Sequence, residues 1–156
     1  MHSRIYQIST EPVKLEDYLC ESDFSEHWFI GSIADYVDRD VDRDADIKNL
    51  REHLVNVALF DTVDSFVILP SGKETYFADA YAAFTAARDK TISMGLSEFA
   101  SVGFSAPVYS MKNAFCDKFA LYVSSDEFNT IPFDEFIRCA DSGCRYYIGG
   151  TLDYHY

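Results

Sequence analysis

Six aspartates between residues 35 and 46 form the stretch whose residue type and spacing could do chemistry. They are Asp35, Asp38, Asp40, Asp42, Asp44 and Asp46, with two arginines between them. Carboxylates repeated at every second residue can bind a divalent cation, begin a helix or engage a basic protein surface. Each use requires different neighbouring residues, which can be checked in the sequence.

A calcium loop of the EF-hand type needs a glycine at its sixth position and a glutamate at its twelfth. A loop that starts at Asp38 has Arg43 and Asn49 at these positions. A loop that starts two residues later fails in the same way. We therefore predict no EF-hand and no dedicated metal site, while weak binding of a cation to the carboxylates stays open.

Two further interpretations of the aspartate run remain. In the first, the run is a solvated entry to a helix, with Asp44 as N-cap and Asp46 opposing the positive end of the helix dipole. In the second, all six aspartates form an acidic surface for a protein partner, in the extreme case by imitating a nucleic-acid backbone. Alternate residues of an extended chain lie roughly 6.5 Å apart on one side, which permits such imitation without selecting it.

The charge of the chain favours a basic protein surface as partner. The sequence has 26 Asp and Glu residues against 13 Lys and Arg residues, a formal net charge of -13. We expect no direct binding of nucleic acid, because that affinity depends on cationic side chains. Residues 1–64 carry a net charge of -9 and residues 65–156 a net charge of -4. A basic partner would therefore meet the half that contains the aspartates.

No catalytic motif stands out elsewhere in the sequence. The histidines are not spaced to place two metal ligands on one helical face, and no cysteine pair has the spacing of a zinc knuckle. The sequence thus favours a non-enzymatic role and predicts no cofactor. The alternative is a small enzyme or small-molecule-binding domain whose site gathers scattered residues such as His27, His53, Cys116 and aromatic side chains.

The composition predicts a single globular domain over residues 1–156. Hydrophobic residues make up 48% of the sequence, and a chain of this length buries roughly 70% of its unfolded surface. No apolar run approaches the roughly 20 residues that cross a bilayer, and the N-terminus lacks the apolar stretch of a signal peptide. We expect a cytoplasmic protein with reduced cysteines and no membrane contact. Homodimerisation is left open.

The hydrophobic pattern predicts an α+β fold, with a mainly antiparallel sheet of about five strands and three to four helices packed on it. The expected strands are residues 3–9, a hairpin over 65–78 that turns at 70–72, a central strand at 119–124 and a last strand at 144–150. The expected helices are residues 22–37, 45–58, 79–93 and 132–141. Residues 96–114 read as an irregular passage.

Overall fold

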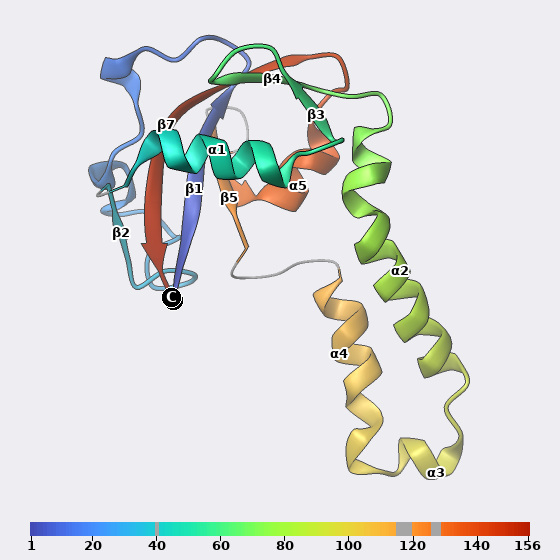
Figure 1. The fold of residues 1–156 in the computed structure, drawn as a ribbon. Coiled ribbons are helices and arrows are strands. Elements are labelled where there is room, and N and C mark those ends of the chain that lie inside the picture. Colours follow the sequence, from blue (N-terminus) through green and yellow to red (C-terminus); the bar gives the residue numbers. More distant parts are fainter. Residues whose placement is uncertain (40, 115–119, 126–128) are drawn as a thin grey trace. The chain divides into compact units, whose positions relative to one another are not determined.

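The computed structural model describes residues 1–39, 41–114, 120–125 and 129–156. The chain forms two compact units, of which unit 1 comprises Met1–Lys73 and Lys118–Tyr156 and unit 2 comprises Glu74–Asp117. Unit 1 contains the sheet, and unit 2 is helical (Figure 1). The expectation of one domain over the whole chain stays a prediction.

The described residues of unit 1 form one mixed sheet of seven strands. Its strands are β1 (His2–Ser9), β2 (Tyr36–Asp38), β3 (Ala58–Phe60), β4 (Ser65–Ile68), β5 (Tyr122–Ser125), β6 (Asn129–Pro132) and β7 (Arg145–His155). The order is β3-β4-β7-β1-β5-β6, and β2 pairs with the C-terminal end of β7. Among the described strands, β1 and β5 are parallel and the other pairs are antiparallel. The α+β class is confirmed, but the sheet is mixed and larger than predicted.

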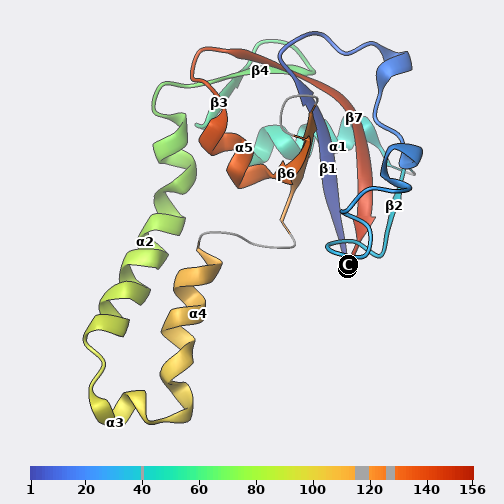
Figure 2. The same cartoon turned by 180° about the vertical axis from the view of Figure 1, so that it is seen from behind.

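Both faces of this sheet are covered. On one face, Tyr6 of β1 packs against Phe133 of helix α5 (Phe133–Cys139) and donates a hydrogen bond to the Asp46 carbonyl of helix α1 (Arg43–His53). On the other face, Phe29 packs against Tyr154 of β7, within a cluster supplied by the segment between β1 and β2. That segment contains the short 3-10 helices η1 (Leu15–Asp17) and η2 (Glu21–Phe24) and lies opposite α1 (Figure 2).

Helix α1 follows from the apolar spacing of its sequence. Ile47 and Leu50 are buried, and Leu54 directly after the helix is buried with them. The helix begins earlier than predicted, because the side chain of Asp42 accepts a hydrogen bond from the Ala45 amide at 3.1 Å. Asp42 is thus the N-cap in place of Asp44.

Two predicted elements are wrong. Residues 22–37 do not form a long helix, because η2 ends at Phe24. Gly31 adopts a positive φ of 80° in a turn where the Phe29 carbonyl accepts hydrogen bonds from three backbone amides. Residues 65–78 do not form a hairpin, because the chain enters helix α2 (Gly72–Ile92) after β4. The hairpin is instead made by β3 and β4.

The C-terminal elements are close to the prediction. Helix α5 begins directly after Pro132, and β7 extends the expected last strand through the tail to His155. Strand β5 lies inside the sheet but next to the edge strand β6, so it is less central than expected. Residue 119 of the predicted strand lies outside the described residues.

Unit 2 consists of most of α2 followed by helix α3 (Leu96–Phe99), the 3-10 helix η3 (Val102–Phe104) and helix α4 (Ser105–Asn113). The alanine-rich helix predicted at 79–93 is confirmed and starts earlier, whereas residues 96–114 are more helical than expected. In the part of the chain that the structure describes, no helix is both long enough and apolar enough to cross a membrane.

Candidate functional site

The aspartates of the run lie in different surroundings. Asp42 caps α1, and Asp44 is exposed in its first turn. The side chain of Asp35 is 74% exposed, and its Oδ2 lies 3.3 Å from Nδ1 of His155. Asp38 lies in the edge strand β2, and Asp40 lies outside the described residues. The described aspartates of the run therefore do not form one continuous exposed row of carboxylates.

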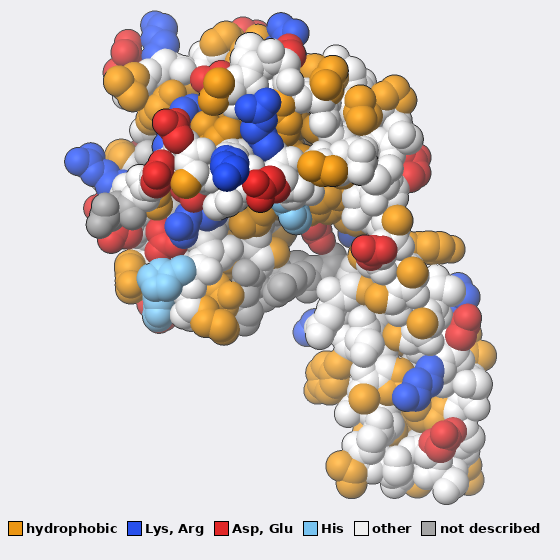
Figure 3. Space-filling model, in the orientation of Figure 1, with side chains coloured by type: hydrophobic (Ala, Val, Ile, Leu, Met, Phe, Trp, Pro, Cys, Tyr) orange, Lys and Arg blue, Asp and Glu red, His pale blue; other side chains and the backbone are white. Residues whose placement is uncertain are grey.

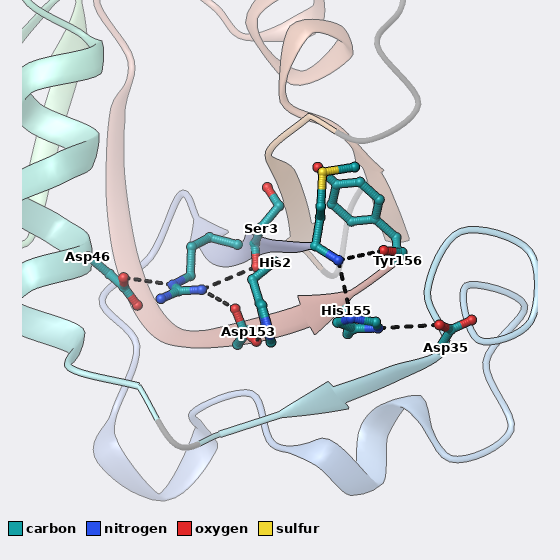
Figure 4. Close-up of polar contacts among 9 residues, drawn as sticks. His2, Ser3, Asp35, Asp46, Asp153, His155 and Tyr156 are labelled. Atoms are coloured by element: carbon teal, nitrogen blue, oxygen red, sulfur yellow. Dashed lines mark hydrogen bonds and ion pairs between the residues drawn. The ribbon is translucent and has the colours of Figure 1, made fainter.

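The structure corrects one member of the predicted partner-binding set, Asp46. Asp46 is only 3% exposed, so it cannot contribute to an exposed acidic surface. Arg4 Nε donates to Asp46 Oδ1 at 2.8 Å, and Thr151 Oγ1 donates to Asp46 Oδ2 at 3.0 Å. Arg4 Nη1 also donates to Asp153 of β7 (Figure 4). Arg4, Asp46 and Asp153 together are called the ion cluster.

The ion cluster joins α1 to the two longest strands of the sheet. Burial disfavours the charge of Arg4, but the hydrogen bond and the negative charge of Asp46 outweigh it, and the pKa of Arg4 is raised. Tyr6 donates to the Asp46 carbonyl at 3.1 Å, and its pKa is raised by burial and further by the charge of Asp46. Both groups thus keep the protonation state that their contacts need.

A small pocket of about 480 Å³ opens beside the ion cluster. His2, Arg4, Tyr6, Asp46, Asn49 and His53 are among its lining residues. Nδ1 of His2 lies 2.5 Å from Asp153 Oδ2, so the pocket contains a histidine already paired with a carboxylate. Burial lowers the pKa of His53, which favours a neutral ring there.

A larger pocket of about 630 Å³ lies between the sheet and the segment that follows β1. Its lining includes the carboxylates of Glu11, Asp17 and Asp23. The hydroxyls of Ser124 and Ser125 in β5 also line it. These groups are hydrogen-bond acceptors or hydroxyls that can accept, so the pocket suits a ligand that donates hydrogen bonds and carries positive charge.

His27 lies at the wall of the 630 Å³ pocket and is held in one orientation. Its Nδ1 accepts from the Phe29 amide at 3.2 Å, and its Nε2 lies 2.9 Å from Oδ1 of Asn129. A neutral ring protonated on Nε2 satisfies both bonds, because that nitrogen then donates to the amide oxygen. His27 therefore positions Asn129, which has a positive φ of 59°, at the edge of the pocket.

The two described histidines of the enzymatic alternative, His27 and His53, do not line the same pocket. His27 lines the larger pocket and His53 the smaller one. Cys116 lies outside the described residues. Within the described residues, no three His, Cys, Asp or Glu side chains are arranged to hold a metal ion.

Sequence reasoning missed the ion cluster, although one signal for it was available. Asp46, Leu50 and Leu54 are four residues apart, so a helix places them in one row. Asp46 therefore belongs to the apolar face of α1 and not to its exposed face. A buried charged residue requires a partner of opposite charge, which the partly exposed Arg4 supplies.

Comparisons of the chain with protein-family models, with curated proteins and with solved structures find no match.

Proposed function

We propose that unit 1 binds a basic protein surface through its acidic segment, defined as residues 11–44. The segment contains eleven acidic and three basic residues, so it carries -8 of the net charge of -13. Long-range attraction to a basic surface raises the rate of association, and like-charged partners are rejected. This concentration of charge in one folded segment is the observation that supports the proposal.

The acidic segment presents most of its carboxylates to solvent. Its exposed acidic residues are Glu11, Glu16, Asp17, Glu21, Asp23, Glu26, Asp35, Asp42 and Asp44. Around α1, in contrast, acidic and basic side chains alternate on the visible face (Figure 3). The strongest negative surface is therefore expected along residues 11–26 and not over α1.

The 630 Å³ pocket gives this surface a point of specificity. Glu11, Asp17 and Asp23 belong to the acidic segment and also line the pocket. Asp23 Oδ2 accepts from the Cys20 amide at 2.8 Å, which fixes that carboxylate. A lysine or arginine side chain of the partner fits such a pocket, because its apolar stem can be buried while its charged end meets the carboxylates. Contacts that are desolvated in this way dominate binding energy more than exposed charge pairs do.

The nucleic-acid-mimic form of the proposal is confined to Asp35–Asp42. The run enters α1 at Arg43, and Asp46 is buried, so the extended spacing that imitation needs ends before the helix. In that form the partner is a protein whose basic surface normally contacts nucleic acid. An excess of duplex DNA would then compete with the chain for the partner.

Binding of a fluorescent lysine-rich peptide tests the proposal. The triple variant Glu11→Gln, Asp17→Asn, Asp23→Asn removes three charges at the pocket and should raise Kd at least about tenfold, equivalent to about 1.4 kcal/mol. The matched control is Asp79→Asn, Asp89→Asn, Glu98→Gln, which removes three exposed charges from unit 2. We expect a change below about threefold for the control, since its three charges do not line the pocket and act on the peptide only through long-range attraction, which physiological salt screens. Equal effects of the two triple variants would show that only net charge matters and would overturn the proposed site.

A second candidate function is small-molecule binding at the 480 Å³ pocket. It is favoured by the paired His2 and Asp153 beside Arg4 and His53. A fragment screen read by NMR would test it, with the ring protons of His2 and His53 as reporters and His27 as internal control. Ligands that move the first two signals and leave His27 unchanged support this function, whereas a screen that moves none of them rejects it.

A further inference from the structure

The described part of unit 2 buries few of its side chains. Among its described residues, 74–114, only Ala87 and Pro107 are buried. Most helical stability in proteins comes from packing an apolar face, and domains of about 40 residues or fewer usually need a metal, disulfides or an oligomeric partner. The helices of unit 2 therefore need a surface that covers them.

The exposed surface of unit 2 is strongly apolar. Six large side chains are between 61% and 100% exposed, namely Tyr81, Ile92, Leu96, Phe99, Val102 and Tyr109. At roughly 200 Å² for each large side chain, they expose on the order of 900 Å². The largest apolar patch on a typical monomer is about 300–600 Å², and a standard interface buries about 800 Å² on each partner. The summed exposed area of these six side chains is therefore comparable to the area that one partner buries in a standard interface.

Helix α2 also presents a surface that another helix can approach closely. Ala78, Ala82 and Ala86 are exposed and lie four residues apart, which places them in one row along the helix. In unit 2, α2 and α4 run in opposite directions and are joined through α3 and η3 (Figure 2). Two such helical hairpins can bury their apolar sides as a four-helix bundle.

We propose that two copies of this chain form a homodimer through unit 2. The charge distribution selects a second copy over a basic partner. Unit 2 has five acidic and three basic residues, a net charge of -2, which leaves -11 for unit 1. Two nearly neutral helical surfaces can pair without strong repulsion, and a two-fold interface uses the same patch on both copies. A basic partner finds its complement on unit 1 instead.

The mass of the chain in solution tests the homodimer. Sedimentation or light scattering over about 1–100 µM should give twice the 17.8 kDa of one chain, with dissociation on dilution. The double variant Leu96→Glu, Phe99→Glu should raise the dimer Kd more than about tenfold. The matched control is Leu15→Glu, Val63→Glu, because these side chains are 77% and 62% exposed in unit 1. The control should leave the mass unchanged.

A second variant separates loss of the interface from loss of the helices. Ala82→Arg keeps a good helix former but blocks close approach of a partner helix, so it should weaken the dimer while far-UV circular dichroism at high concentration stays close to wild type. A wild-type chain that is monomeric at about 100 µM would overturn the proposal. The apolar side chains of unit 2 would then have to be covered by something other than a second copy. A dimer that survives both unit 2 variants would also overturn it.

Discussion

Removal of the Asp46 carboxylate should destabilise unit 1 by about 3 kcal/mol. In Asp46→Ala, Arg4 loses the acceptor of its Nε bond, and Thr151 loses the acceptor of its hydroxyl. Both bonds have the Asp46 carboxylate as acceptor, and a hydrogen bond to a charged group contributes about 1.5–3 kcal/mol. The Arg4 side chain is 32% exposed, so water replaces part of what it loses, and the lower value applies to its bond. The Thr151 bond supplies the remainder.

Urea unfolding followed by the fluorescence of Trp28 measures this change. Trp28 is the one tryptophan of the chain, and it packs against Phe29 in unit 1, so its signal reports on that unit. Asp44→Ala is the matched control, because Asp44 is exposed two residues earlier in the same run. Its effect should stay within about 0.5 kcal/mol. If Asp46→Ala costs no more than Asp44→Ala, the ion cluster does not stabilise α1 against the sheet, and the reasoning is refuted.

Three further predictions concern unit 1. Asp42→Ala should cost about 1 kcal/mol by removing the N-cap of α1, whereas Asp42→Asn, which keeps an acceptor, should cost only a few tenths in the same urea titration. His53 has a pKa lowered by burial from 6.5, so the folded state favours the neutral ring, and the associated stability is present above about pH 6.5 and is lost as the pH falls. His53→Gln should therefore lose less stability than wild type between about pH 7.5 and 5.5; an identical loss in both proteins would contradict this. Gly72→Ala should cost about 1–3 kcal/mol, because the added Cβ would lie 2.2 Å from the Val57 carbonyl oxygen, and a neutral result would mean that α2 can shift freely at its start.

The elements that sequence could predict are those defined by local patterns. The apolar spacing of α1 and the proline before α5 are local signals, and both helices are present. The hairpin expected at 65–78 was wrong because Gly72, which reads as a turn residue, begins a helix where it packs closely against the Val57 carbonyl. A tertiary contact of this kind has no local signature.

The candidate site was less predictable, because its residues are distant in the sequence. Asp46 contacts Arg4, which precedes it by 42 residues, and Thr151, which follows it by 105 residues. A run of similar aspartates gives no indication of which member will be buried against an arginine. Only the helical row of Asp46 with Leu50 distinguishes it from Asp44.

The position of β1 within the sheet has a consequence for biosynthesis. Both of its neighbours, β5 and β7, are encoded more than a hundred residues later in the chain. At about 5–20 residues per second, a ribosome needs roughly 7–29 s after β1 to produce both of them. During that time Ile5, Tyr6 and Ile8, which are buried in the finished protein, have no strand partner. A chain whose synthesis stops before β7 lacks the strand that joins β4 to β1, so its sheet stays in two parts.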